Sequence, residues 1–208
     1  MEDFFNAINL LKKSEVNKLI ESRINRFKEI RNSSHNKIFE ELCFCIMTAN
    51  CSADKCIEVQ KLIGDGFNNL PEEELAQNLK LYGYRFPNIR AKYIVRAREF
   101  QKELKIKIKT YKGLPELREW IVSNIKGLGY KEASHFLRNI GFTEYAIIDF
   151  HILDLLTKFR LIEKPKTLTK TKYLEIEELL EQIAVKLNLN LAELDLYMWY
   201  METGKILK

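Results

Sequence analysis

The sequence predicts an all-α fold, and three observations lead to this prediction. Apolar residues recur at three- and four-residue steps along most of the chain, as on one face of a helix. There are only 8 glycines and 4 prolines in 208 residues, which is few for the many tight turns of a β-rich fold. Hydrophobic residues make up 46% of the chain, enough for a core, so disorder is not expected.

Helices of the first half are predicted at residues 14–31, 38–49, 52–64, a short stretch from 71, and 88–103. Ser14 and Ser52 stand where a hydroxyl can cap a helix N-terminus. Pro71 opens the short helix, whose first turn carries three glutamates that the helix dipole favours there.

Helices of the second half are expected at residues 115–124, 130–140, 151–160, 172–187 and 191–203. Two windows read as strands, Ile106–Lys109 and Tyr145–Ile148, and both are short. The chain has no internal repeat and no Ser/Gly-rich linker, so nothing in its composition marks a domain boundary.

Composition narrows the classes of function. Lys and Arg number 34 against 29 Asp and Glu, and the resulting net charge of +5 permits a nucleic-acid partner without establishing one. Four cysteines fall within residues 43–56 at spacings typical of neither zinc nor iron–sulfur sites, so no metal site is expected. Without a basic leader or an apolar run of about 20 residues, the chain is expected to be soluble, in a reducing compartment and away from membranes.

Residues 125–131 carry the strongest functional signal. Gly127 and Gly129 place a tight turn between two predicted helices, and glycine lets a backbone approach another group closely. The free N–H groups at the start of the second helix form an anion site, for which phosphate is the obvious ligand. A purely steric role for the two glycines is the alternative.

Three residues near this turn have chemistry to offer. Lys131 lies in the first turn of the second helix, where the dipole disfavours a cation and so favours a neutral, nucleophilic amine. Asp149 precedes another helix, so it is expected to cap that helix and to hold a carboxylate near the reacting centre. His151 follows and can meet a phosphate. The alternatives are a solvent-facing lysine, a simple capping residue and a surface histidine.

The segments GLGYKEASHFLRN (127–139) and AIIDFH (146–151) together resemble the helix–hairpin–helix DNA glycosylases. They most closely resemble the type-2, archaeal-style 8-oxoguanine DNA glycosylase/lyases, and the resemblance extends over residues 41–50, 85–94 and 194–208. The sequence departs from the family at Phe150, where members often have a basic residue. No cysteine quartet follows the catalytic segment, which favours the oxoguanine branch over iron–sulfur relatives.

The resemblance implies an all-α, two-lobed helix–hairpin–helix fold with a DNA cleft between the lobes. Residues 1–36 plus 150–208 would form one lobe, and residues 37–149 the other, with the hairpin at about 115–139. The implied partner is double-stranded DNA that contains 8-oxoguanine. The implied protein is a monomeric repair enzyme of the cytoplasm, associated with the nucleoid, with no cofactor except a monovalent cation at the hairpin.

The resemblance also implies roles for single residues. Lys131 attacks the sugar, Asp149 stabilises the developing positive charge, and a Schiff base leads to β-elimination. Asn50 contacts the cytosine left unpaired, Phe86 wedges between bases, and Arg90 binds DNA. For Asn50 and Phe86 the alternatives are a turn residue and a core residue.

Four further residues are implied to recognise the base. Lys208 ends the chain and is expected to place its carboxylate or its side chain in the base pocket, the alternative being a frayed terminus. Trp199 is expected to stack on the flipped base, Asp195 to bond its edge, and His135 to line the opposite wall. As core residues without a ligand, these three would look the same in sequence.

Two rival functions stay open at this point. One is a glycosylase of the same fold that acts on another oxidised base. The other is a non-catalytic helix–hairpin–helix module that binds DNA, and it would need the glycines but neither Lys131 nor Asp149.

Overall fold

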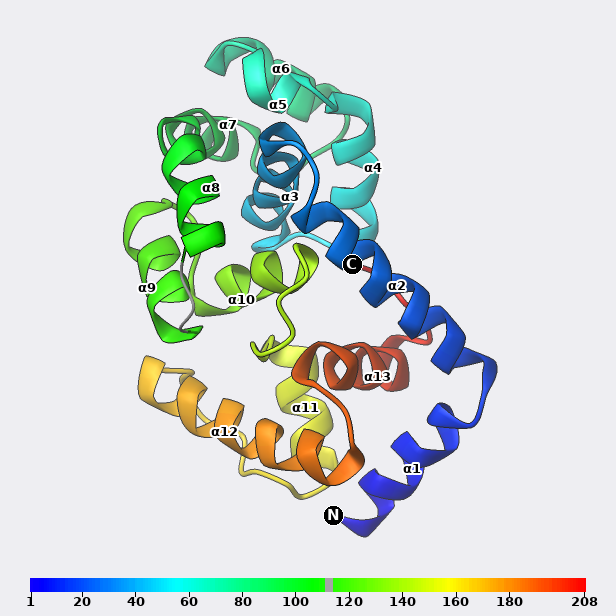
Figure 1. Ribbon diagram of the computed structural model, residues 1–208. Helices are drawn as coiled ribbons and strands as arrows, with labels where there is room; N and C mark the ends of the chain where they lie inside the picture. The colour runs from blue at the N-terminus through cyan, green and yellow to red at the C-terminus, as the bar shows by residue number, and fades with distance from the viewer. Residues whose placement is uncertain (111–113) are drawn as a thin grey trace.

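A computed structural model describes residues 1–110 and 114–208, and all regular structure in these ranges is helical (Figure 1). The prediction of an all-α fold is confirmed. The elements are α1 (Glu2–Lys12), α2 (Glu15–Arg31), α3 (His35–Thr48), α4 (Ala53–Ile63), α5 (Gly66–Asn69), α6 (Glu72–Leu81), α7 (Pro87–Ala97), the 3-10 turn η1 (Arg98–Phe100), α8 (Gln101–Thr110), α9 (Leu114–Asn124), α10 (Tyr130–Asn139), α11 (Phe150–Lys158), α12 (Lys170–Leu187) and α13 (Leu191–Thr203).

The helix starts predicted from capping residues are confirmed. Ser14 accepts a hydrogen bond from the N–H of Val16 at 3.2 Å, and Ser52 accepts one from Lys55 at 3.4 Å. α1 and the short α5 were not anticipated from the sequence. The predicted helix over 88–103 is in fact α7, η1 and α8 in succession, which together reach Thr110.

Both strand predictions are wrong. Residues 106–109 lie within α8, where Leu104 and Ile108 face the core four residues apart and Ile106 is 61% exposed, so helical periodicity decides the structure. Residues 145–148 are buried and belong to no helix, yet they pair with no strand in the described part of the chain. Side chains of α12 form hydrogen bonds with the backbone of Ala146 and Ile148 in this segment.

The buried apolar side chains form two clusters. The first contains residues from Ile38 to Tyr145, on α3 to α10, and the second combines α1 and α2 with residues from Ala146 to Met198. In Figure 1 the helices α3 to α10 form the upper part, α1 and α11 to α13 form the lower part, and α2 runs along both. The lobes predicted as 1–36 plus 150–208 and 37–149 stay a prediction.

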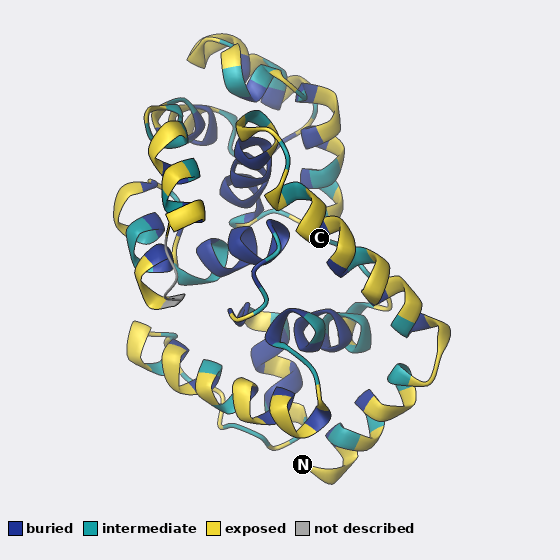
Figure 2. Cartoon of the chain, in the orientation of Figure 1, coloured by how far each residue is buried: buried dark blue, intermediate teal, exposed yellow. Residues whose placement is uncertain are grey.

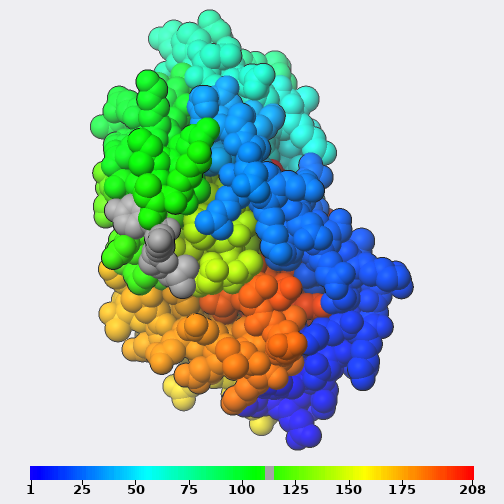
Figure 3. Space-filling model, in the orientation of Figure 1, coloured from blue at the N-terminus to red at the C-terminus, as the bar shows by residue number. Residues whose placement is uncertain are grey.

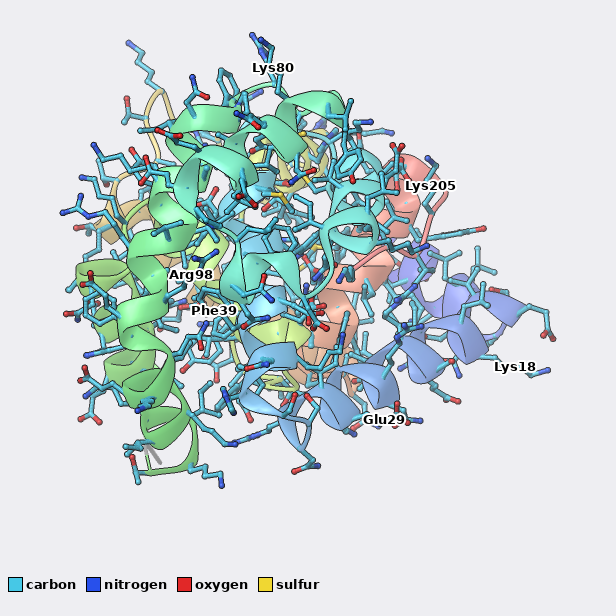
Figure 4. All side chains as sticks on the ribbon, turned by 90° about the horizontal axis from the view of Figure 1, so that it is seen from above. Lys18, Glu29, Phe39, Lys80, Arg98 and Lys205 are labelled. Carbon is cyan, nitrogen blue, oxygen red and sulfur yellow. The ribbon has the colours of Figure 1, made fainter. Side chains whose placement is uncertain are left out.

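Two buried helices carry the centre of the molecule. α10 packs against α3, α9 and α2, and Figure 2 shows α3 and α10 as largely buried while α12 presents an exposed outer side. In the space-filling view, α12 and α2 cover much of the lower face (Figure 3). Lys18 and Lys80 project outward from α2 and α6, whereas Phe39 of α3 is 1% exposed (Figure 4).

No helix in the described ranges is long and apolar enough to cross a membrane. Nor do three or more His, Cys, Asp or Glu side chains gather into a potential metal site among the described residues.

Candidate active site

A cavity of about 750 Å³ is lined by elements from both apolar clusters. Its wall is built from the turn after α3, the start of α4, one face of α10, residues 147–152, α13 and the C-terminal segment. Eight residues predicted to be functional lie in this wall: Asn50, Lys131, His135, Asp149, His151, Asp195, Trp199 and Lys208. Residues up to 158 positions apart in the chain therefore meet in one site.

Lys131 and Asp149 both face the cavity from the first residues of helices. Lys131 is the second residue of α10 and is partly exposed. Asp149 caps α11, and its Oδ1 accepts a hydrogen bond from the N–H of Ile152 at 3.0 Å, so the capping role is confirmed. Within the described residues, the Lys131 ammonium has no hydrogen bond or salt bridge. The site thus holds an unengaged amine and a carboxylate fixed by its own helix.

Asp195 lies in the cavity wall as a member of a buried ion pair. Arg138 donates to its Oδ2, and both side chains are nearly inaccessible, at 5% and 6% exposed. Burial raises the pKa of Asp195 to about 6, the nearby Asp149 charge adds to the shift, and Arg138 opposes it. The carboxylate predicted to bond a base edge is therefore already engaged by Arg138, a partner that the sequence did not reveal.

His135 and Trp199 bring polar atoms that lack partners. Both ring nitrogens of His135 and the Nε1 of Trp199 are buried without a hydrogen bond. Burial lowers the pKa of His135 well below its ordinary value, and the positive charges of Arg138 and Lys131 act in the same direction. The Lys208 backbone lies close enough to oppose this shift, but not at hydrogen-bond geometry. Polar atoms without a partner in a cavity wall can be satisfied by water or by a bound ligand.

Lys208 is held firmly by its side chain. Its Nζ donates to Glu41 Oε1 at 2.6 Å and to Gln60 Oε1, and it lies 4.5 Å from the centre of the Phe44 ring. Arg23 of α2 also donates to the Ile206 carbonyl at 3.4 Å. These contacts contradict the frayed-terminus alternative and keep the last residue in the cavity wall.

The hairpin glycines lie outside the cavity wall. Gly127 has a φ of +93°, and a Cβ there would meet the Tyr93 ring at 2.5 Å, so glycine is required both by the backbone and by close packing on α7. The N–H of Gly129 donates to Glu132 Oε2 at 3.1 Å. The structure thus supports the steric role that the sequence left open, and phosphate binding at the hairpin stays a prediction.

Two residues predicted to contact DNA, Arg90 and Phe86, pack against other parts of the chain. Arg90 is 8% exposed, and its Nη2 donates to the Ala49 carbonyl at 3.0 Å, so it supports the turn after α3, while its contact with DNA stays a prediction. That turn places Asn50, at a φ of +64°, in the cavity wall. Phe86 is partly buried, packs against the first cluster, and does not line the cavity, which favours its alternative as a core residue.

Sequence reasoning missed the residues that hold the C-terminus. Glu41 is 6% exposed and accepts hydrogen bonds from Lys208, Gln60 and Asn139. A glutamate in the apolar run of α3 was the available signal, because a buried carboxylate needs a partner.

The chain is similar to known proteins over most of its length. Residues 20–189 match the family model described as 8-oxoguanine DNA glycosylase. The 8-oxoguanine DNA glycosylase/AP lyase of Methanocaldococcus jannaschii is 52% identical over 202 residues, 97% of either chain, and that of Korarchaeum cryptofilum is 49% identical over 209 residues, 100% of this chain and 99% of the other.

Solved structures give the same result. The crystal structure of the Methanocaldococcus jannaschii 8-oxoguanine DNA glycosylase has a TM-score of 0.94 at 51% identity and covers 100% of this chain and 97% of its own. The same enzyme, solved in complex with 15mer DNA containing 8-oxoguanine, gives a TM-score of 0.95 at 51% identity, with 99% of both chains covered. The chain described here therefore belongs to the 8-oxoguanine DNA glycosylase family.

Proposed function

We propose that this chain removes 8-oxoguanine from double-stranded DNA and then cleaves the abasic strand, with Lys131 as the nucleophile. The observation that carries the proposal is the Lys131 amine, without a partner in the described structure, in the same cavity wall as Asp149. Relatives that match over nearly the whole chain are named glycosylase/AP lyases, which agrees with both activities.

The reaction follows from the chemistry of these two side chains. The damaged nucleotide leaves the base stack, because its glycosidic carbon cannot be reached inside a duplex. The neutral Lys131 nitrogen attacks the sugar C1′, and the bond from C1′ to the base breaks, so the base leaves with the electron pair and takes up a proton that the amine gives up. Asp149 stabilises the positive charge that develops on the sugar. The C1′–O4′ bond of the sugar then opens, with a proton passing to O4′, and leaves a Schiff base between Lys131 and C1′. Loss of a proton from C2′ expels the 3′ phosphate as the leaving group, and this β-elimination breaks the strand on the 3′ side of the lesion.

Lys208 is proposed to select the base through its carboxylate. Its ammonium is already engaged by Glu41 and Gln60, so the carboxylate is the group left to face a ligand. In 8-oxoguanine N7 carries a hydrogen and is a donor, whereas in guanine N7 is an acceptor. A fixed acceptor favours the lesion, and an unmet buried polar group costs about 1–3 kcal/mol, or roughly 5- to 150-fold in discrimination.

Trp199 and His135 complete the proposed pocket. Trp199 is proposed to stack on the flipped base, with the unpaired nitrogens of His135 on the opposite wall. Asn50 is proposed to contact the cytosine opposite the lesion, and His151 a backbone phosphate. No organic cofactor is needed, since Lys131 supplies the reactive group. A monovalent cation is proposed to bind at the hairpin. The proposed location is the cytoplasm, in association with the nucleoid.

Borohydride trapping tests the proposal directly. The wild type, mixed with a duplex that contains 8-oxoguanine and reduced with borohydride, is expected to give a covalent protein–DNA adduct. Lys131→Gln is expected to give none while still binding the duplex, because the amide cannot form an imine. An adduct formed by Lys131→Gln would refute the assignment of the nucleophile, and no adduct with the wild type would favour the non-catalytic module.

A further inference from the structure

A buried polar network joins α9, α10 and α12 to the segment that delivers Asp149. Its members are Arg118, Ser134, Tyr173 and Glu177, and none of them lines the cavity. Arg118 is 4%, Ser134 0% and Tyr173 2% exposed, so these three are shielded from water, while the Glu177 side chain is 14% exposed. The reaction described above uses none of these side chains.

The network holds the backbone just before Asp149. Residues 145–148 pair with no strand in the described structure, so their buried polar groups need side-chain partners. Tyr173 Oη donates to the Ala146 carbonyl at 2.6 Å and accepts from the N–H of Ile148 at 3.3 Å. Glu177 Oε1 accepts from the N–H of Ala146 at 2.9 Å. Two side chains of α12 thus fix three backbone groups of this segment.

The same hydroxyl also reaches the helix of Lys131. Because the proton of Tyr173 goes to Ala146, the Ser134 hydroxyl donates to Tyr173 Oη, at 3.2 Å. Ser134 lies three residues after Lys131 on α10, within one turn. Tyr173 Oη therefore contacts both α10, which carries Lys131, and the segment that precedes Asp149.

An ion pair keeps these groups in place. Arg118 makes two parallel hydrogen bonds to Glu177, at 2.6 and 2.7 Å, and a third to Ser134 Oγ at 3.1 Å. Its guanidinium lies 5.0–5.7 Å from the ring centres of Tyr130, Tyr145 and Tyr173. A bidentate pair of this kind fixes geometry, whether or not it adds net stability.

We propose that Tyr173 is a positioning residue, whose hydroxyl sets the place of the Asp149 carboxylate relative to the Lys131 amine. The inference rests on the proposed roles of Lys131 and Asp149. Loss of the hydroxyl leaves the ring packing intact but frees the Ala146 carbonyl and the Ile148 N–H. A displacement of about 1 Å can slow a reaction on the order of 100-fold, so removal of the hydroxyl should slow catalysis without weakening DNA binding.

The experiment compares Tyr173→Phe with Tyr197→Phe. Tyr197 is also nearly fully buried, at 1% exposed, but its hydroxyl donates to Asn17 of α2 and touches nothing in the network. Rates are measured on an 8-oxoguanine duplex at a temperature where circular dichroism shows every variant folded. Tyr173→Phe is expected to lower kcat by roughly 10- to 100-fold with KM and duplex Kd unchanged. Tyr197→Phe is expected to match the wild type.

Equal kcat values for Tyr173→Phe and Tyr197→Phe, or a loss confined to KM, would overturn the inference. Should Tyr173→Phe fail to fold, Ser134→Ala removes only the link to α10, and it is expected to lower kcat in the same direction by a smaller factor. The proposed function is tested separately: trapping by Lys131→Gln would refute the nucleophile, whereas an inert Lys131→Gln with a fully active Tyr173→Phe would refute only the positioning role.

Discussion

Lys131 and Lys208 line the same cavity, but only Lys208 has hydrogen-bond partners for its ammonium in the described structure. The ammonium of Lys131 is unengaged in the described structure, at the start of α10. The ammonium of Lys208 donates to Glu41 and Gln60 and lies against the Phe44 ring. Residue type and location are the same, so the difference between the two comes from their partners.

The comparison shows how one side chain serves two purposes. A lysine that must attack a sugar needs an amine without an anionic partner, since a salt bridge holds the proton on the nitrogen. A lysine that must hold a chain end needs such a partner. Removing Lys131 should therefore abolish chemistry, and disturbing Lys208 should lower only the recognition of the base.

Among changes at Lys208, extension of the chain beyond this residue is expected to have the largest effect on recognition of the base. Two appended residues, Gly-Ser, convert the terminal carboxylate into a neutral amide, so excision of 8-oxoguanine is expected to fall by roughly 5- to 150-fold. Cleavage at a preformed abasic site should change little, because no base has to be recognised there. Both rates are measured on matched duplexes, with the same dipeptide at the N-terminus as the control. Equal losses on the two substrates would contradict this role of the carboxylate.

A smaller effect is expected when only the anchor of Lys208 is loosened. Glu41→Gln removes the charge that holds the ammonium, and hydrogen bonds to charged groups are worth about 1.5–3 kcal/mol. Excision is expected to fall about 10-fold, again with cleavage of abasic sites preserved. The matched control is Glu40→Gln, since Glu40 is similarly buried, at 7%, but pairs with Lys37. If Glu40→Gln gave the same loss, the anchor would not be specific.

Two of the residues in the cavity wall carry a local signal in the sequence, whereas Asn50, His135, Asp195, Trp199 and Lys208 were expected only from the family resemblance. Lys131 and Asp149 were identified from their places at helix starts, and the Asp149 cap is present as predicted. The binding of Lys208 to Glu41 and Gln60 spans 167 and 148 residues, and no local pattern encodes such a contact. The hydrogen bond of Arg90 to the Ala49 carbonyl is also invisible to a local pattern, because it depends on the packing of α7 against the turn after α3.

The strand predictions failed in an instructive way. Ile106 and Ile108 alternate with lysines as in a strand, but Leu104 and Ile108 are also spaced four residues apart, as on one face of a helix. The structure adopts the helix, with Leu104 and Ile108 buried. Residues 145–148 have the apolar character of a strand, but α12 supplies Tyr173 and Glu177 as partners in place of a neighbouring strand. Local propensity thus could not specify which groups would satisfy the backbone of this segment.

The smallest expected effect concerns His135, whose pKa is influenced by both Lys131 and Lys208. Its pKa in the folded chain lies well below the ordinary 6.5, mainly through burial, and Lys131 lowers it further while the Lys208 backbone opposes this. The unfolded chain therefore binds a proton below pH 6.5 that the folded chain does not, so stability falls as the pH falls. Asp195, with a pKa raised to about 6, acts in the opposite sense, but it is present in every variant compared.

His135→Gln should remove this acid sensitivity. Between pH 6.5 and 5, the wild type is expected to lose more unfolding free energy than the variant, with a slope that approaches but does not exceed about 1.4 kcal/mol per pH unit for one proton. Urea unfolding at each pH measures the difference, and the exposed His35, changed to Gln, is the control that should follow the wild type. Parallel pH curves for wild type and His135→Gln would mean that the ring takes up a proton in the folded cavity. His135 would then be a cation in the cavity wall, which contradicts the neutral ring expected from its lowered pKa.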